Sequence, residues 1–316
     1  MDRRHLSTGL LLAVTAAVSF GVSGTFVKPL LDSGWSPVAA VTLRALVGGL
    51  LLAPLALVAL RGDLRPIWRA RRRVASMALV GVAGTQGFYF AAIERIPVGT
   101  AILLEYAAPL LLVAVAWATT RRRPATSVLV GSVVAAGGLV LVVSPAGGGA
   151  LDPVGVLLGL AAMVCCAGWF VLAAQSSEGL PPVAAASAAL LAAAVLLGVV
   201  GLTGLLPFTA STADVVVLGA VVPWWQPVLV IGLVATAVAY ASSITAGALL
   251  GARLASFLGL LEVVAAAAWA WVLLGERLSA PQLIGGLVLV AGIAAVMRER
   301  AAAPVAPAVG TAPVAS

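Results

Sequence analysis

AILLEYAAPLLLVAVAW (Ala101–Trp117) and LGLLEVVAAAAWAWVLL (Leu258–Leu274) are two versions of one apolar segment. Both contain Leu-Leu-Glu in the same register, so Glu105 and Glu262 occupy equivalent positions. A carboxylate at the centre of a bilayer costs ~2.5–3.5 kcal/mol or more, and such residues usually face a polar cavity. One in each copy of a repeated segment indicates a duplicated membrane protein with its site between the two copies.

The composition supports a membrane location. Of the 316 residues, 62% are hydrophobic and 9% are charged, whereas a soluble domain carries roughly 25% charged residues. The first apolar stretch follows Arg3, Arg4 and His5, and more apolar stretches come after it without a cleavage site of the Ala-x-Ala type. We therefore expect an integral membrane protein whose first span is not removed as a signal peptide.

A membrane-spanning helix needs about 20 mostly apolar residues. Breaks rich in charge, proline and glycine predict ten spans near 7–27, 37–60, 74–93, 98–118, 126–144, 153–174, 183–206, 226–247, 254–274 and 281–297. Segment 207–225 is predicted to be an external loop on the membrane surface, because Val215–Val222 is too short to cross and Pro223-Trp224-Trp225 is typical of an interfacial anchor.

The basic residues predict the orientation. With the N-terminus inside, all 18 lysines and arginines fall in inner segments except Lys28, Arg44, Arg95 and Arg277. This matches the positive-inside rule and predicts that both termini are cytoplasmic. The run Arg61–Arg73 (RGDLRPIWRARRR) and the net charge of +7 are explained in the same way, so we expect no nucleic-acid partner.

Two further matches extend the duplication. Val128–Val142 resembles Gln282–Val296, and Asp32–Ala40 shares Gly-x-x-Pro-Val-Ala-Ala with Ser177–Ala185. A five-span repeat crosses the membrane an odd number of times, so its second copy is inserted upside down. The predicted fold is thus all-α, with ten transmembrane helices as two inverted five-helix repeats. Residues 1–148 form the first repeat, 149–300 the second, and 301–316 a disordered Ala/Pro-rich tail.

Glu105 and Glu262 are the main candidates for binding a proton or a substrate, and the alternative is that each is a buried structural group. Pro109 follows Glu105 on the same helical face and can kink the helix. Arg44 lies at a depth similar to that of Glu105, so the two can pair, or Arg44 can extend to the lipid headgroups. Lys28 is an interfacial anchor or a contact for a substrate carboxylate.

The remaining candidates would line the cavity or pack between helices. They are Gly24 and Thr25 on the first span, Gln86 and Tyr89 on the third, Tyr106 on the fourth, Trp169 on the sixth, Tyr240 on the eighth and Trp269 on the ninth. Glycines on the fifth and tenth spans permit close packing, either within one chain or in a homodimer.

Other classes of protein fit poorly. Cys165 and Cys166 are adjacent in an apolar stretch and read as packing residues, and His5 is the single histidine. We expect no metal site and no cofactor. The single lysine is Lys28, which excludes a Walker A loop. An intramembrane protease of the serine type needs a base, and no histidine lies in a span. A channel usually builds its pore from symmetric subunits, whereas this chain carries its own internal repeat.

The chain resembles an EamA-type transporter of the drug/metabolite transporter superfamily over residues 8–298. Leu43-Arg44-Ala45, Ala91–Thr100 (AAIERIPVGT) and above all Leu273–Gly285 (LLGERLSAPQLIG) carry the resemblance. Leu104–Pro109 is similar to the branch that exports threonine and homoserine. The first half departs from the family at Thr119–Pro124, and Val263 and Val264 stand where the family often has proline, so no kink is expected there.

This resemblance implies a central cavity between the helices and outward transport of small metabolites. Together with the residues above, it predicts a transporter of the plasma or inner membrane that exports amino acids or other small amphiphilic metabolites, with proton antiport through Glu105 and Glu262. The alternatives are an importer or facilitator of the same fold, and more distantly an intramembrane enzyme or a channel.

Overall fold

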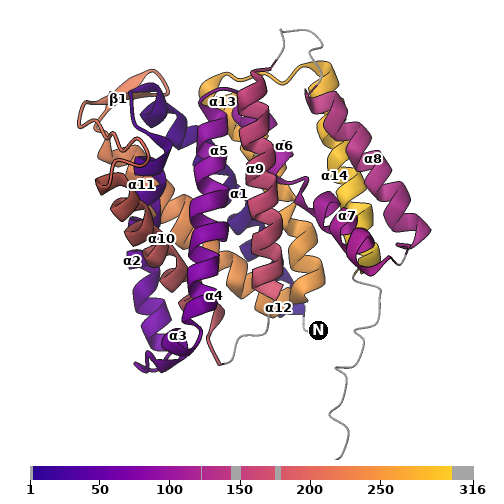
Figure 1. Ribbon diagram of the computed structural model, residues 1–316, viewed down its shortest axis with the longest axis horizontal. Helices are drawn as coiled ribbons and strands as arrows, with labels where there is room; N and C mark the ends of the chain where they lie inside the picture. Colours follow the sequence, from indigo (N-terminus) through magenta and orange to yellow (C-terminus); the bar gives the residue numbers. More distant parts are fainter. Residues whose placement is uncertain (1–2, 122, 144–150, 175–178, 301–316) are drawn as a thin grey trace, which may run out of the picture.

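The computed structural model describes residues 3–121, 123–143, 151–174 and 179–300 and is a bundle of helices with one small hairpin (Figure 1). The predicted tail, 301–316, lies outside the described residues. The helices are α1 (Arg3–Asp32), α2 (Pro37–Ala59), α3 (Arg65–Arg69), α4 (Arg71–Ser76), η1 (Met77–Gly84), α5 (Thr85–Ile93), α6 (Val98–Glu105), α7 (Ala108–Thr120), α8 (Thr126–Val143), α9 (Pro153–Ala174), α10 (Pro182–Leu202), α11 (Trp225–Gly232), η2 (Leu233–Val238), α12 (Ala239–Gly259), α13 (Leu261–Leu274) and α14 (Ala280–Arg300).

Each predicted span falls on helix. Within the described residues, seven helical stretches are long and apolar enough to cross a membrane: 5–32, 37–59, 71–93, 98–120, 153–172, 182–202 and 225–251. Three shorter apolar helices, 126–142, 261–274 and 280–296, overlap the other predicted spans. The second of them starts seven residues later than the predicted span 254–274, and the count of ten spans stays a prediction. The chain is therefore a multi-pass membrane protein.

The boundary between the eighth and ninth predicted spans coincides with a break in the helix. Gly251, inside α12, has φ of +79° and ψ of +158°, so α12 consists of two helical parts joined at a kink, and the stretch that is apolar enough to cross the membrane ends at the same residue. A second interruption, which was not predicted, lies at Leu260, and α13 starts with Leu261. This break lies next to Glu262, so the expectation of an unkinked ninth span is wrong.

Segment 207–225 contains the one departure from an all-α fold among the described residues. Val215–Val217 (β1) and Ala220–Val222 (β2) pair antiparallel, and the two turn residues Leu218 and Gly219 have φ of +56° and +78°. Positive φ at both turn positions matches the twist of a tight hairpin. The β-branched valines favour strands over a surface loop.

The last helices of the two predicted repeats pack against each other. A Cβ atom placed on Gly138 of α8 would lie 2.4 Å from the Leu289 nitrogen of α14, and one on Gly292 of α14 would lie 2.5 Å from the Ala135 nitrogen of α8. Absence of side chains at these points lets the backbones touch. The two helices stand side by side at one edge of the molecule (Figure 1), so these glycines serve packing within the chain.

Candidate functional site

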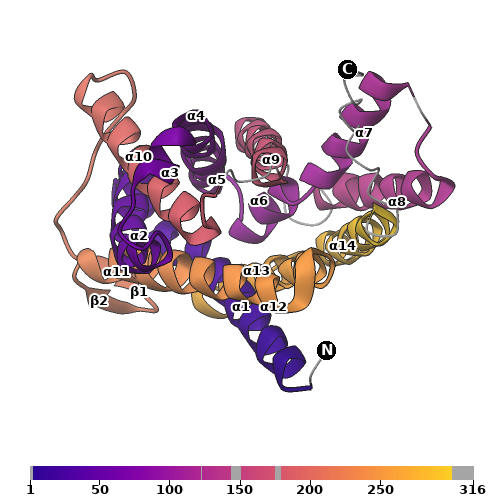
Figure 2. The same ribbon diagram turned by 90° about the horizontal axis from the view of Figure 1, so that it is seen from below.

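A cavity of about 480 Å³ lies among the helices of both repeats. Seen from below, α5, α6 and α9 lie on one side and α12 and α13 on the other (Figure 2). The predicted residues that line the cavity are Arg44, Gln86, Glu105, Tyr106, Pro109, Trp169, Tyr240 and Glu262. Eight residues from six different spans, chosen by sequence, thus meet in one place.

Two interrupted helices bring the glutamates to the cavity. Glu105 is the last residue of α6, and the chain turns at Tyr106 and Ala107 before α7 begins. Pro109 stands in the first turn of α7, where its missing N–H leaves no donor for the carbonyl of Glu105 four residues earlier. In the second repeat, Glu262 lies in the first turn of α13, directly after the break at Leu260.

Arg44 does not pair with Glu105, so that prediction is wrong. Its Nε donates to Thr236 Oγ1 at 2.9 Å, one Nη donates to Gln86 Oε1, and the other donates to the Ala235 carbonyl at 3.2 Å. The guanidinium also lies over the ring of Phe90, 5.7 Å from its centroid. Arg44 is 5% exposed, and it joins α2 and α5 of the first repeat to η2 of the second.

The two glutamates differ in their partners. Tyr106 donates its hydroxyl hydrogen to Glu262 Oε2 at 2.5 Å. Glu105 is 6% exposed, and its buried Oε2 has no hydrogen-bond partner. Neither carboxylate belongs to the ion pairs found among the described residues, which are Lys28–Asp32 and Arg95–Asp152.

Two π-helical segments flank the cavity, and they reveal a repeat that the sequence reading missed. Thr85 at the end of η1 donates to the Val80 carbonyl at 3.1 Å, and Thr236 in η2 donates to the Ile231 carbonyl at 2.8 Å, both five residues back. Their surroundings share Gly-x-x-x-Thr-x-x-x-Tyr, in Gly81–Tyr89 and Gly232–Tyr240. This spacing could have identified Thr236, and π-helical turns are frequent at functional sites.

Other lining residues escaped prediction because they are apolar or lie in a loop. Phe20 of α1 meets Tyr240 edge-on, with ring centroids 5.2 Å apart. Arg73, read from sequence only as part of a basic loop, lines the cavity near the start of the third span and donates to the Leu172 carbonyl at 3.3 Å. Its Nη1 is buried without a partner.

The cavity extends toward the end of the bundle at which α1 begins. Ala13, Arg73 and Pro182 line it. Arg73 and Pro182 lie in the first turns of α4 and α10, and Ala13 lies in the first half of α1. In Figure 1 this is the end that carries α3, opposite the hairpin. The exposed arginines Arg61, Arg65, Arg69, Arg71 and Arg72 gather at the same end.

The opposite end is closed by contacts among α1, α5, α6 and the turn after α13. Lys28 donates to the Ile93 carbonyl at 3.0 Å and lies 3.6 Å from Asp32. Glu276 accepts the Val98 N–H at 2.8 Å, and burial raises the pKa of its carboxyl. Lys28 therefore lies outside the cavity, where it joins the C-terminal ends of α1 and α5. Its role as an interfacial anchor stays a prediction.

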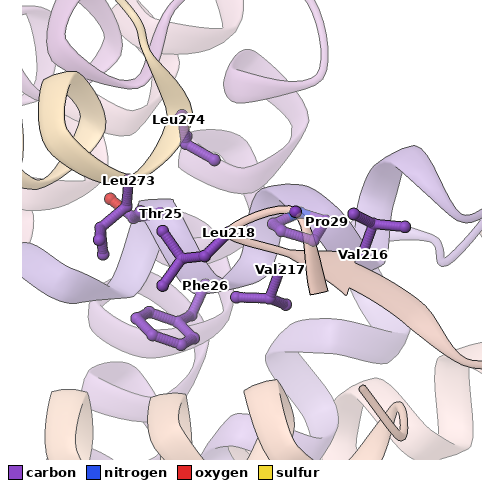
Figure 3. Close-up of a pocket in the computed structure, with 9 residues that line it drawn as sticks. Thr25, Phe26, Pro29, Val216, Val217, Leu218, Leu273 and Leu274 are labelled. Atoms are coloured by element: carbon purple, nitrogen blue, oxygen red, sulfur yellow. The ribbon is translucent and has the colours of Figure 1, made fainter. Parts of the chain in front are cut away.

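Four other predicted residues also lie outside this cavity. Tyr89 packs against Gly24, where an added Cβ would come within 2.5 Å of its hydroxyl oxygen. Trp269 donates its indole N–H to the Val18 carbonyl at 3.1 Å. Thr25 lines a second pocket, of about 260 Å³, beneath the hairpin. There Val216, Val217 and Leu218 lie over α1, beside Leu273 and Leu274 (Figure 3).

Comparisons with known proteins agree with this arrangement. The model of a family described as the EamA-like transporter family matches residues 7–144 and 153–298. A solved structure titled "Crystal structure of protein" is 22% identical, with a TM-score of 0.61, over 93% of this chain and 99% of its own. At that identity the likeness concerns the fold alone. No curated protein matches.

Proposed function

The chain belongs to the EamA-like transporter family, and from this premise we propose that it is a proton-coupled exporter of small amphiphilic metabolites. The family consists of membrane transporters of the drug/metabolite transporter superfamily, not of enzymes. The observation that carries the proposal is the cavity in which Glu105 and Glu262, equivalent residues of a duplicated segment, meet beside Arg44.

The proposed topology has ten spans in two inverted repeats, residues 1–148 and 149–300, with both termini cytoplasmic in the plasma or inner membrane. Two observations support it. The chain matches the family model twice, once in each half. The exposed arginines of the segment before α4 lie at the end of the bundle where α1 begins, as the positive-inside rule requires for a cytoplasmic N-terminus.

With that orientation, the cavity faces the cytoplasm and the outer side is closed. Phe20, Tyr106, Trp169 and Tyr240 supply aromatic walls for an apolar body, and the small residues Ala13, Ala16 and Ala17 leave room for it. Opening of the outer side would separate the contacts that Lys28 and Glu276 make with the ends of α5 and α6. Inverted repeats provide such alternating access by moving against each other.

Transport is tested by efflux from proteoliposomes of labelled amino acids and amphiphilic amines, with and without an imposed pH gradient. Threonine and homoserine are the first amino acids to try, because Leu104–Pro109 is similar to that branch of the family. We expect at least one solute to leave faster when the gradient is imposed. We also expect Glu105→Gln or Glu262→Gln to remove that acceleration.

Three outcomes would change the proposal. If solutes move but respond neither to the gradient nor to the two substitutions, the protein is a facilitator and the glutamates are structural. If uptake rather than efflux follows the gradient, the protein is an importer of the same fold. If no solute moves, amino acids and amines are the wrong substrates and the export proposal fails.

A further inference from the structure

The charged side chains of the cavity are not equally available to a ligand. Glu105 is 6% exposed and its buried Oε2 has no hydrogen-bond partner. More than nine in ten buried polar groups in proteins have a partner, so an orphaned carboxylate oxygen needs an explanation. A carboxylate is an acceptor and has no hydrogen of its own to give. The missing partner is therefore a donor: a proton, a neutral N–H or O–H group such as water, or a cationic N–H group. Of these, a proton or a cationic group also neutralises the buried charge, which is costly to leave unpaired.

The other two deep charges are already engaged. Glu262 accepts the hydroxyl hydrogen of Tyr106. Arg44 donates to Thr236, Gln86 and the Ala235 carbonyl, three acceptors supplied by the protein itself. These bonds use three of the five N–H groups of Arg44, so a substrate carboxylate would share the guanidinium with three acceptors of the protein. A substrate ammonium group would meet a Glu105 oxygen that has no other donor.

Arg73 is the remaining cation that lines the cavity, and its Nη1 is also buried without a partner. It donates to the Leu172 carbonyl of α9, whereas Leu104, the residue before Glu105, packs against Gly159 of the same helix. At 1.5 Å per residue, positions 159 and 172 are ~20 Å apart along the helix axis. The ammonium and carboxylate of an α-amino acid are separated by a single carbon, so one small zwitterion cannot reach both Glu105 and Arg73.

We propose that Glu105 is the counter-ion for a protonated amine, and that the substrate of this cavity is an amphiphilic monoamine that needs no carboxylate. The proposal rests on the transport function above and narrows its substrate class. Phe20 and Tyr240 meet edge-on beside Tyr106 and Trp169, and aromatic faces attract ammonium groups. A volume of about 480 Å³ suits a single small ligand.

The same carboxylate couples the substrate to protons. A protonated Glu105 and an ionised Glu105 paired with a monovalent ammonium carry the same net charge, so one form replaces the other by exchange of one proton for one amine. The titratable groups that line the cavity with Glu105 are Arg44, Arg73, Tyr106, Cys166, Tyr240 and Glu262, and Cys165 and Tyr89 lie in the neighbouring helices α9 and α5.

The test is equilibrium binding of three matched probes to the purified full chain in detergent: phenethylamine, phenylalanine and 3-phenylpropionate. They share one apolar body and carry an amine, both groups, or a carboxylate. We expect phenethylamine to bind at least as tightly as phenylalanine, and 3-phenylpropionate about tenfold or more weaker. Binding of the amine weakens as the pH is lowered, because protons compete for Glu105.

Glu105→Gln should weaken binding of phenethylamine by about tenfold or more, and Glu105→Asp should retain part of it. Glu262→Gln is the matched variant and should have the smaller effect, because that carboxylate already has a donor. Thermal unfolding of each variant shows whether it is folded. A second measurement needs no variant, because saturating phenethylamine should protect Glu105 of the parent from a hydrophobic carbodiimide, as read by mass spectrometry.

The proposal is overturned if the carboxylate probe binds as well as the amine, if phenylalanine binds about tenfold tighter than phenethylamine, or if none of the probes binds. It is also overturned if binding of phenethylamine does not depend on Glu105 and does not protect Glu105 from the carbodiimide. Amine binding that depends on Glu105 without any efflux would support this site and refute the transport function. If a pH gradient drives efflux but binding of the amine does not depend on Glu105, the transport function is supported and this site is refuted.

Discussion

The helix that carries Glu105 and its counterpart that carries Glu262 are both interrupted beside the glutamate, and they differ in where the break falls and in chemistry. The break follows Glu105, at Tyr106–Ala107, and precedes Glu262, at Leu260. Glu262 receives the hydroxyl hydrogen of Tyr106. The position equivalent to Tyr106 in the second repeat is Val263, which has no hydroxyl to give, so Glu105 remains without a donor.

The same contrast holds across the third and eighth spans. Each repeat retains a π-helical turn closed by a threonine, Thr85 or Thr236. The residues in register with Arg44 and Gln86 of the first repeat are Ala189 and Ala237 in the second. Duplication preserved these π-helical turns, and divergence of side chains created one polar site that has no symmetric twin.

The largest difference between the two repeats is expected for substitutions of the two glutamates. Glu105→Gln should lower efflux of an amine driven by a pH gradient by about 30-fold or more, because it removes the free carboxylate. Glu262→Gln should lower it less. Initial efflux rates from proteoliposomes measure both, with protein incorporation checked on the same vesicles. Equal losses would show that the two glutamates act as one unit.

The next effect concerns the arginine that only the first repeat has. Arg44→Ala leaves Gln86, Thr236 and the Ala235 carbonyl without their buried donor, and each such group costs ~1–3 kcal/mol. We expect a lower unfolding temperature by several degrees in detergent. Arg71→Ala, at the exposed first residue of α4, is the control and should change the unfolding temperature little. An unchanged value for Arg44→Ala would mean that its three bonds contribute nothing to stability.

Where the repeats remain symmetric, matching substitutions should have matching effects. Gly138→Val on α8 and Gly292→Val on α14 each push side-chain atoms into the opposite backbone, at a cost of ~1–3 kcal/mol. Gly137→Val is the control, since an added Cβ there meets no atom within 4 Å. Thermal unfolding compares the three. A clear difference between Gly138→Val and Gly292→Val would show that the two glycines contribute unequally to stability, although their contacts are alike.

A smaller difference is expected between the two π-helical threonines. Thr85→Val removes one hydrogen bond to a carbonyl, whereas Thr236→Val removes such a bond and also the acceptor of Arg44 Nε. At ~1 kcal/mol for each hydrogen bond, Thr236→Val should be the more destabilising by about that amount. Chemical or thermal unfolding of the two variants decides, and equal destabilisation would contradict the role of Thr236 as a partner of Arg44.

The smallest effect lies where the two halves of the chain meet outside the spans. Arg95 donates to Asp152 Oδ2 at 3.0 Å, and this hydrogen bond lowers the pKa of the Asp152 carboxyl, with help from the Val154 N–H. A lowered folded-state pKa gives stability that is present above the unfolded value of about 3.9 and is lost as the pH falls through the folded value. Arg95→Gln should flatten that dependence in unfolding measured between pH 7 and about pH 3. If the parent and Arg95→Gln lose stability in parallel as the pH falls, the Arg95–Asp152 pair does not contribute to stability.

The sequence by itself determined the membrane location, the positions of the helices and the equivalence of Glu105 and Glu262. Apolar length, scarce charge and repeated motifs are properties of the chain read in order, and a bilayer converts them directly into spans. The same reading selected eight of the residues that line the cavity, because polar and aromatic side chains within apolar spans are uncommon enough to stand out.

Tertiary structure alone decided which of these residues touch. Matching depth suggested that Arg44 pairs with Glu105, but depth along a helix says nothing of lateral neighbours, and Thr236, Gln86 and the Ala235 carbonyl take its donors instead. Neither the hairpin at 215–222 nor the break at Leu260 was predicted from the sequence. Hydrogen-bond partners are set by directions in space between distant parts of the chain, and these directions are absent from a one-dimensional pattern.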